Sequence, residues 1–267
     1  EEKHMKLIKL MLSLLCAAAM LLMVAGCSTV PANTVFSADD IPGKTIGVQL
    51  GTTGDIVYAS DYETDGETKV ERFTKTNDAV QALKQGKLDC IILDEQPAKY
   101  YVEANEDLQV IAGSFAPEDY AICVAKDKIN DALATLKENG TLANIIANYI
   151  GEDDVKGTMP YVSSNTDYSN GKLVMVTEAT FPPYEYYEGG EGKIVGIDID
   201  MAQAIADLLK MELEVQDIAF DSIVTSVQTG KADIGVAGLT VDEDRLQYVN
   251  FTEPYTTSEQ VIIVRAK

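Results

Sequence analysis

The sequence predicts an α/β protein with two lobes, each built on a mostly parallel sheet flanked by helices. From residue 44 onward, short apolar runs alternate with segments of helical periodicity, which is the pattern of strands joined by helical crossovers. The alternation stops at the polar, non-periodic residues 152–170 and then resumes, so this stretch is predicted to be a linker. The two parts share a weak repeat, since residues 79–94 and 223–238 both combine a helix, Gly-Lys, a spacer, Asp and an apolar strand.

In the first part, apolar runs bounded by turn residues predict strands, and the periodic segments between them predict helices. The strands are expected at residues 44–50, 68–73, 88–93, 107–112 and 119–125. The helices are expected at residues 53–60, 77–86, from 95, at 128–140 and at 141–151. Gly140 and Gly151 end the last two, as glycine commonly does at a helix C-terminus.

The second part repeats the same kind of alternation after the linker. Its strands are expected at residues 172–177, 193–200, 212–218, 232–238 and 259–267. Its helices are expected at residues 201–210, 222–230 and from about 241. Each part is therefore predicted to form a lobe of the same α/β type.

Composition excludes several classes of function. The formal net charge of −22 argues against nucleic acid and anionic headgroups as partners. The only histidine is His4, so His-based triads, His general bases and most zinc sites are excluded for the rest of the chain, and no metal or cofactor is expected. Cys90 and Cys123 lie in apolar runs and are predicted to be buried free thiols, with a cross-strand disulfide as the alternative.

The front of the chain predicts export. A basic start and a continuous apolar run over residues 10–24 indicate a cleaved leader, residues 5–26, because a membrane span needs about 20 apolar residues. The small residues before Cys27 resemble a bacterial lipobox, in which the cysteine is acylated, and residues 27–38 would form a tether. An ordinary cleaved leader with an incidental cysteine is the alternative.

Candidate binding residues follow the predicted strands at their carboxyl ends, where open α/β sheets bind ligands. The turn Gly51–Gly54 opens a helix and offers backbone N–H groups and hydroxyls to an anion. The other residues in such positions are Asp94, Glu178, Phe181, Phe220, Thr240 and Arg245.

These residue types suit a free amino acid. Arg245, with N–H groups of the Thr52-Thr53 turn, would hold a carboxylate, and Asp94 would take an ammonium group. Glu178 would pair with a cation or accept a hydrogen bond from an amide. Together the residues predict a binding site with a planar cation, an acid and a selective wall.

Phe181 and Phe220 would form the wall around the ligand side chain. A second interpretation stays open at this point. In this second interpretation, Arg245 only bonds its neighbours Asp242 or Glu243. Asp94 then caps its helix, and both phenylalanines belong to the core.

Several motifs resemble a known family. The strings TEATFPPYEYY, GIDIDMAQAIADLL, DIAFDSIVTSVQTGKADIGVAGLTVDEDR and FTEPY are similar to the first half of the extracellular polar-amino-acid-binding proteins that serve ABC importers. The strings DIPGKTIGVQLGTTGD, DAVQALKQGKLDCIILDE and LKENGTLANIIANYIG are similar to the second half of that family. The resemblance covers nearly all of the chain after residue 38 and implies a two-lobe periplasmic-binding-protein-like fold of type II.

The resemblance implies a role for each candidate. It implies carboxylate binding at Arg245 and ammonium binding at Asp94. It implies a side-chain-selecting acid at Glu178, where Asp is commoner in the family, and a variable specificity position at Gln49. Further contacts and an aromatic clamp are implied at Thr52, Thr53, Gly238, Thr240, Phe181 and Phe220.

The order of the two halves is reversed relative to the family, which implies a circularly permuted chain. Under this hypothesis residues 39–118 form lobe 2, residues 171–267 form lobe 1, and helices in 126–151 pack on lobe 1. One covalent crossing between lobes is expected, at residues 119–125. The C-terminal strand, residues 259–267, would complete the other crossing by packing without a peptide bond, and residues 152–170 would join two ends on one lobe.

The expected function is capture of a basic or polar amino acid outside the cell and its delivery to the membrane subunits of an ABC importer. The protein is expected to act as a monomer, anchored through Cys27 at the extracellular face of the membrane or in the periplasm. Two other functions stay open: a sensor or binding module without transport, and a dehydratase or lyase that uses Glu178 as general acid or base.

Overall fold

The computed structural model describes residues 30–266 except residues 114 and 125–127. The predicted leader and Cys27 lie outside the described residues. From Ala32 onward the chain forms one compact unit. Within residues 30–266, no helix has both the length and the apolar character needed to cross a membrane.

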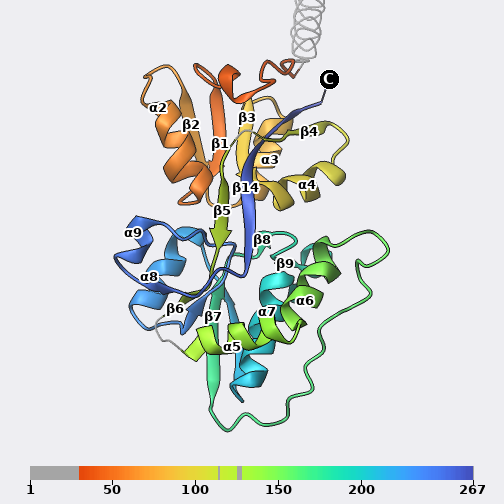
Figure 1. Ribbon diagram of the computed structural model, residues 1–267. Helices are drawn as coiled ribbons and strands as arrows, with labels where there is room; N and C mark the ends of the chain where they lie inside the picture. Colours follow the sequence, from red (N-terminus) through yellow and green to blue (C-terminus); the bar gives the residue numbers. More distant parts are fainter. Residues whose placement is uncertain (1–29, 114, 125–127, 267) are drawn as a thin grey trace, which may run out of the picture. The chain divides into compact units, whose positions relative to one another are not determined.

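Lobe 2 is built on a six-stranded sheet with the order β2-β1-β3-β14-β4, in which β5 also pairs with β14 (Figure 1). Its strands are β1 (Thr45–Gln49), β2 (Lys69–Phe73), β3 (Cys90–Asp94), β4 (Leu108–Ile111), β5 (Pro117–Tyr120) and β14 (Thr256–Arg265). Its helical segments are η1 (Ala38–Asp40), η2 (Gly54–Ala59), α2 (Ser60–Glu63), α3 (Thr76–Lys84) and α4 (Glu95–Glu103). The first three strands are parallel, and β14 runs antiparallel to its neighbours.

Lobe 1 is built on a five-stranded sheet with the order β11-β7-β12-β6-β13, and a small sheet, β10-β9-β8, lies in the same lobe. Its strands are β6 (Cys123–Val124), β7 (Lys172–Thr177), β8 (Thr180–Phe181), β9 (Glu185–Tyr187), β10 (Ile194–Val195), β11 (Glu212–Asp217), β12 (Ile234–Gly235) and β13 (Asn250–Phe251). Its helical segments are α5 (Lys128–Glu138), α6 (Thr141–Ile150), η3 (Glu188–Gly190), α7 (Ile197–Leu208), η4 (Phe220–Ser222), α8 (Ile223–Gln228) and α9 (Glu243–Leu246).

Both main sheets combine parallel strands with flanking helices, so the predicted α/β class is confirmed. The central strands are apolar and almost completely buried, as the continuous apolar runs predicted. Cys90 in β3 and Cys123 in β6 are buried free thiols in different sheets, which bears out the first of the two alternatives for the cysteines.

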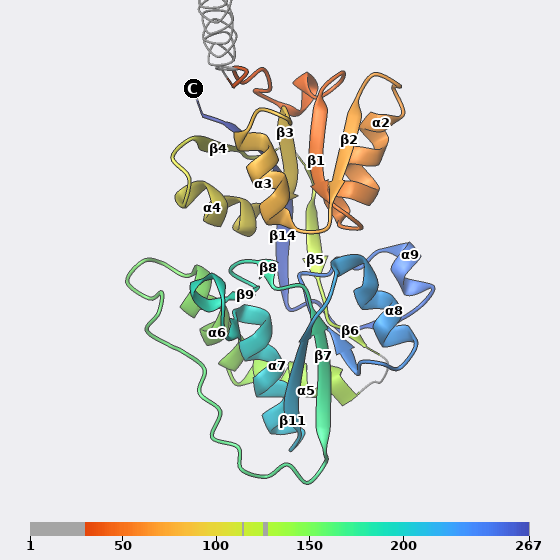
Figure 2. The ribbon, with the colours of Figure 1, turned by 180° about the vertical axis from the view of Figure 1, so that it is seen from behind.

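The assignment of residues 171–267 to a single lobe is wrong at its end. The strand β14 lies in the sheet of lobe 2, between β3 and β4. The chain therefore crosses between the sheets twice in the described residues, once from β5 to β6 and once from β13 to β14, and not once as expected (Figure 2). The run Val261–Val264 is fully buried, and only a position inside a sheet covered on both faces provides that burial.

The strand expected at residues 193–200 is also wrong, because only Ile194–Val195 is extended and α7 begins at Ile197. The alternating letters of this segment look like a strand, but Gly196 has φ of 137° and turns the chain into a helix. A Cβ at Gly196 would lie 2.0 Å from the carbonyl oxygen of Tyr184, so glycine is required there.

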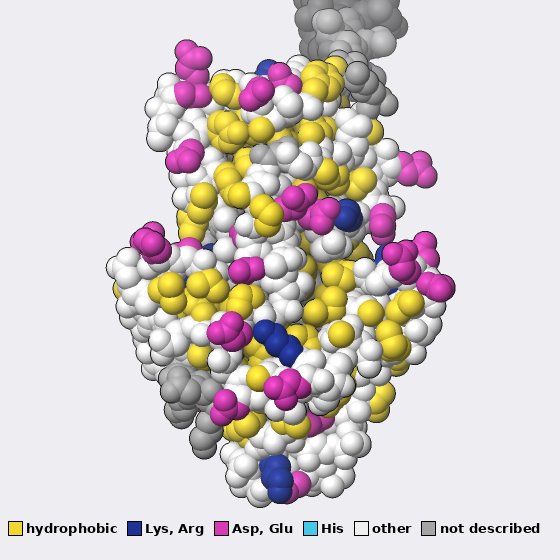
Figure 3. All heavy atoms as spheres, in the orientation of Figure 1, with side chains coloured by type: hydrophobic (Ala, Val, Ile, Leu, Met, Phe, Trp, Pro, Cys, Tyr) yellow, Lys and Arg dark blue, Asp and Glu magenta, His cyan; other side chains and the backbone are white. Residues whose placement is uncertain are grey.

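The predicted linker contains no helix or strand in residues 152–170. It is nevertheless attached to lobe 1, because Tyr161 and Ser163 both donate to the carboxylate of Asp207 in α7, at 2.7 and 2.9 Å. The helices α5 and α6 contact α7 as well. The acidic side chains are scattered over both lobes (Figure 3), which fits the expectation that most of them are solvated.

Candidate functional site

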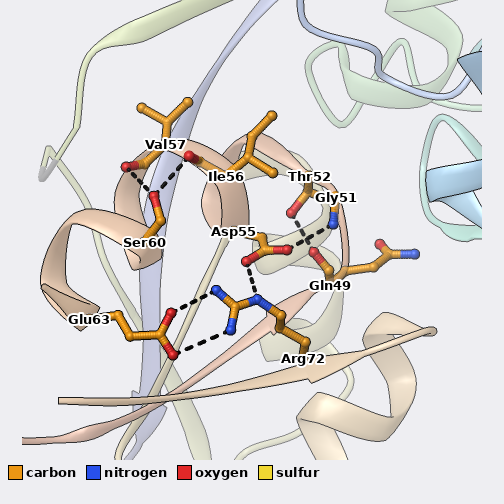
Figure 4. Close-up of polar contacts among 9 residues, drawn as sticks. All are labelled: Gln49, Gly51, Thr52, Asp55, Ile56, Val57, Ser60, Glu63 and Arg72. Atoms are coloured by element: carbon orange, nitrogen blue, oxygen red, sulfur yellow. Dashed lines mark hydrogen bonds and ion pairs between the residues drawn. The ribbon is translucent and has the colours of Figure 1, made fainter. Parts of the chain in front are cut away.

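The turn after β1 is held in place from within lobe 2. Asp55 accepts a hydrogen bond from the Gly51 N–H at 2.9 Å and forms an ion pair with Arg72, whose Nε lies 2.7 Å from Oδ1 (Figure 4). Arg72 also reaches Glu63 at 3.0 Å. The hydroxyl of Thr52 donates to the carbonyl of Gln49 at 2.8 Å. This network fixes the turn at the edge of lobe 2 that meets lobe 1.

Arg245, at 8% exposure, spans the two lobes. Its guanidinium donates to the Thr240 carbonyl at 2.7 Å in lobe 1 and to the Gly51 carbonyl at 3.0 Å in lobe 2. Nε lies 3.0 Å from Asp242 Oδ2, so the contact foreseen in the second interpretation is present. The turn presents the Gly51 carbonyl to Arg245, and the N–H groups of Gly51 and Thr52 bond Asp55 and Gln49.

The two predicted aromatic residues have different surroundings. The guanidinium carbon of Arg245 lies 5.6 Å from the ring centroid of Phe220, which is a cation–π distance. Phe181 is 5% exposed and stacks on Tyr184 with centroids 5.8 Å apart. Gly238, with φ of 55°, lies against the Phe181 ring, and a Cβ there would come within 2.7 Å of it. Phe181 is thus part of the core as well as of the predicted wall.

Glu178 and Gln49 meet between the lobes and are 2% and 3% exposed. The amide of Gln49 donates to Glu178 at 3.0 Å, and the hydroxyl of Thr180 donates to the same carboxylate oxygen at 2.7 Å. The carbonyl oxygen of the Gln49 amide accepts from Thr76 at 2.9 Å, which fixes the orientation of the amide. Burial raises the pKa of Glu178, and the two hydrogen bonds partly oppose this rise.

Asp94 follows β3 and is 4% exposed. Its Oδ1 atom accepts hydrogen bonds from the hydroxyl of Tyr120 and from the amide of Gln260, the latter at 2.7 Å. Asp94 occupies the N-cap position of α4, but its side chain makes no capping hydrogen bond. Burial raises the pKa of Asp94 well above its usual range, and the nearby charge of Glu118 adds to the rise. The carboxylate is therefore costly to bury without a cation.

The hydroxyls of Thr53 and Thr240 connect the lobes. Thr53 Oγ1 donates to Thr240 Oγ1 at 2.9 Å, and Thr240 Oγ1 donates to Glu118 at 2.6 Å. A pocket of about 580 Å³ borders Thr53, Thr240 and Glu118. A second pocket of about 260 Å³ borders Gly51, Phe220 and Arg245. Five of the ten residues predicted for ligand binding thus take part in hydrogen bonds between the lobes, namely Gln49, Thr53, Glu178, Thr240 and Arg245.

Sequence reasoning did not single out several polar residues that support the site. They are Glu118, Tyr120, Glu185, Asp198, Tyr255 and Gln260. Half of them come from the crossing strands β5 and β14, which look in the sequence like ordinary strands. One signal in the sequence could have pointed to them. A polar residue at a strand position that the apolar/polar alternation predicts to be buried indicates a buried polar contact.

Asp198 holds the turn that carries Gly238. It is fully buried and accepts from the Gly238 N–H at 3.1 Å and from the Tyr255 hydroxyl at 3.0 Å. Burial raises the pKa of Asp198 to about 6. The neighbouring Glu185 is fully buried too, and burial followed by the charge of Asp198 raises its pKa well above its usual range. A protonated Glu185 can donate to Asp198, which gives both buried carboxyl groups a partner.

The arrangement suits binding. One guanidinium, the two buried carboxyl groups of Asp94 and Glu178, and the partly exposed carboxyl group of Glu118 lie where the two lobes meet. Such groups recognise a ligand that carries a carboxylate and one or two cationic groups, with the aromatic rings as an apolar wall.

The comparisons with known proteins match parts of the chain. The model of the bacterial extracellular solute-binding proteins, family 3, matches residues 173–267. The match covers about the last third of the chain, so the similarity to this family is shown for that part. Similar curated proteins are the arginine-binding extracellular protein ArtP of Bacillus subtilis, 37% identical over 103 residues, and the ABC transporter arginine-binding protein 1 of Escherichia coli, 34% identical over 94 residues.

These similarities cover parts of the proteins compared. The ArtP alignment spans 38% of this chain and 40% of ArtP, and the Escherichia coli alignment spans 35% and 38%. Among solved structures, an ancestral arginine-binding protein bound to arginine is 44% identical over 32% of this chain and 38% of its own, with a TM-score of 0.31. The arginine-bound domain 1 from TmArgBP is 36% identical over 36% of this chain and 82% of its own, with a TM-score of 0.32.

Proposed function

We propose that the protein captures a basic amino acid outside the cell and delivers it to an ABC importer. The observation that carries the proposal is the meeting of Arg245, Asp94 and Glu178 at the boundary of the lobes. Arg245 would bind the ligand carboxylate, Asp94 its ammonium, and Glu178 a cationic side chain, with Gln49 beside it. The family match and the names of the similar arginine-binding proteins support this proposal over a dehydratase or lyase.

Further contacts of the same site are proposed for the remaining candidates, which are Thr52, Thr53, Phe181, Phe220, Gly238 and Thr240. A bound ligand would replace hydrogen bonds that now join the lobes directly. Glu178 would exchange its bond with Gln49 for the ligand side chain, and Arg245 would turn from Gly51 to the carboxylate. The groups that bind the ligand would then be the same groups that hold the lobes together. Ligand binding would therefore be coupled to movement of the lobes.

A thermal-shift screen of the protein without residues 1–26 tests the function. It should be refolded to remove ligand and exposed to the twenty amino acids, ornithine and citrulline. A ligand at a hundred times its Kd stabilises by about 2.7 kcal/mol, which raises the unfolding temperature measurably. We expect shifts with arginine and other basic amino acids, lost in Arg245→Ala and Asp94→Ala. No shift with any of these compounds would contradict the proposed function.

We also propose that the chain is a circular permutant of its family. Residues Val35 and Ile41 pack in the same apolar cluster as Ile262 and Val264, so the two sides of the supposed cut lie in one core. A chain relinked as residues 171–267 followed by 39–151 should therefore fold and bind the same ligand. Failure of the relinked chain to fold would contradict the permutation. Anchoring through Cys27 belongs to the same proposal and is tested by lipid labelling of Cys27→Ser.

A further inference from the structure

Three polar side chains on the crossing strands face Asp94. Tyr120 and Glu118 lie two positions apart on β5, so they project from the same side of that strand. Gln260 on β14 stands directly opposite Asp94 in the register of β14 and β3. These side chains form a continuous row of hydrogen bonds along the wall of the site that the crossing strands provide.

Gln260 joins two carboxyl groups through one nitrogen. Its Nε2 atom donates to Asp94 Oδ1 at 2.7 Å and to Glu118 Oε1 at 2.5 Å. The orientation of the amide follows, because the opposite orientation would place an amide oxygen against two acids. Gln260 is 1% exposed, and its Oε1 atom has no partner among the described residues. A buried amide held in this way places Glu118 beside Asp94 in a fixed geometry.

Placing the carboxylates of Asp94 and Glu118 side by side costs electrostatic free energy, and a bound cation would offset this cost. Buried Asp94 and half-buried Glu118 repel each other, and the positive charge of Arg245 acts on both carboxylates. Arg245 is already engaged with Thr240, Gly51 and Asp242. The hydroxyl of Tyr120 and the amide of Gln260 both donate to Oδ1 of Asp94, and the carboxyl group of Glu118 lies within hydrogen-bond reach of the Asp94 carboxyl group.

We propose that Glu118 is a second acid of the ammonium subsite, so that the α-amino group of the ligand is bound by Asp94 and Glu118 together. This inference rests on the proposed function and adds a residue to it. An ammonium group has three N–H donors and can bond both carboxylates at once. The ligand class that suits the site is then an amino acid with a free, unmodified α-amino group and a cationic side chain, since Glu178 provides a third acid at the opposite end.

Two ligands and two variants test the inference. Binding of L-arginine and of 5-guanidinopentanoate, which is arginine without its α-amino group, should be measured by calorimetry and, for weak binding, by displacement of labelled arginine. The variant Glu118→Gln keeps the size of the side chain and removes its charge. The matched control is Asp119→Asn, which removes an equal charge from the next residue of β5, where the side chain is exposed. The unfolding temperature of each variant should be measured to check that it is folded.

We expect Glu118→Gln to weaken arginine binding about tenfold or more, as for loss of a charge-assisted hydrogen bond, and to change binding of the analogue less than threefold. Asp119→Asn should change neither by more than about twofold. Equal weakening of both ligands by Glu118→Gln would mean that Glu118 only holds Thr240 and Gln260, and it would overturn the inference. Unchanged arginine binding would overturn it as well. A wild-type protein that binds no amino acid would instead refute the proposed function.

Discussion

Gln49 of lobe 2 donates a hydrogen bond to Glu178 of lobe 1 at 3.0 Å, and the side chains of both residues are almost completely buried. The sequence separates them by more than a hundred residues, and no local pattern relates them. The contact brings the candidate selectivity residues of the two lobes together. An amide facing a carboxylate is also the kind of pair that a guanidinium or ammonium group can separate and bind.

The variant Glu178→Gln should reduce arginine binding strongly. The amide removes the charge and leaves a neutral pair with Gln49, so we expect a loss of about 1.5–3 kcal/mol, or roughly 10-fold to 150-fold in Kd. Binding of neutral glutamine should suffer less. Calorimetry with both amino acids measures the difference, with Glu191→Gln as a control because Glu191 is exposed in the same lobe. Equal losses for arginine and glutamine would contradict a selective role for Glu178.

The variant Gly238→Ala should destabilise the protein and impair binding. Its Cβ would lie 2.7 Å from the Phe181 ring, at a backbone φ of 55° that disfavours any side chain. A loss of about 2–4 kcal/mol in the free energy of unfolding is expected from the two effects. Gly230→Ala is the matched control, since Gly230 has φ of 72° and nothing within 4 Å of the added Cβ. Denaturant unfolding that gave the same loss for both would show that Phe181 does not restrict this position.

The pH dependence of the free energy of unfolding should reveal the raised pKa of Asp198. Its pKa in the folded protein, about 6, lies above the ordinary aspartate value of 3.8. The folded state therefore holds its proton more tightly, and this contribution to stability is full below the lower value and lost as the pH rises through 6. Relative to Asp198→Asn, the free energy of unfolding of the wild type should fall by about 2.4 kcal/mol between pH 4 and pH 7.

Denaturant unfolding at several pH values measures this difference between wild type and Asp198→Asn. Asp61→Asn is the control, because Asp61 is exposed on α2 and its replacement removes the same charge. Its curve should stay parallel to that of the wild type. A constant difference between the wild type and Asp198→Asn from pH 4 to pH 7 would contradict the raised pKa.

The amides of β14 should be among the slowest to exchange with solvent. Ile262 and Ile263 pair with β3 on one side and β4 on the other, and both side chains are fully buried. Strand β11, which pairs only with β7 in its sheet, gives the comparison. Hydrogen exchange measured by mass spectrometry should show stronger protection for β14 than for β11. Faster exchange in β14 would mean that the crossing strand opens locally between the lobes.

The sequence predicted most of the elements, because strands such as Thr45–Gln49 and helices such as Thr76–Lys84 carry strong local periodicity. It failed at Ile197, where alternating letters hid a helix start set by the tertiary contact of Gly196 with Tyr184. The pairing of β14 with β3 and β4 was missed for a related reason. Antiparallel insertion between β3 and β4 is a long-range pairing, and the apolar letters of residues 259–265 are the same in either lobe.

The candidate site shows the same limit. Residues after strand ends, such as Asp94 and Arg245, could be chosen because topology gives that position a meaning. Glu118 and Gln260 could not, since they lie within strands and nothing local indicates that their side chains face Asp94. The direct hydrogen bonds between the lobes could not be predicted from the sequence either, because they depend on how the surfaces of the two lobes meet.

The place of β14 in its sheet also orders events during synthesis. Strands β1 to β4 leave the ribosome long before Thr256–Arg265, yet β3 and β4 pair only through that segment. Until it arrives, lobe 2 has two exposed strand edges and an incomplete core, which is a state that chaperones recognise and that folds slowly. Lobe 2 can therefore complete its sheet only after the last part of the sequence has been translated.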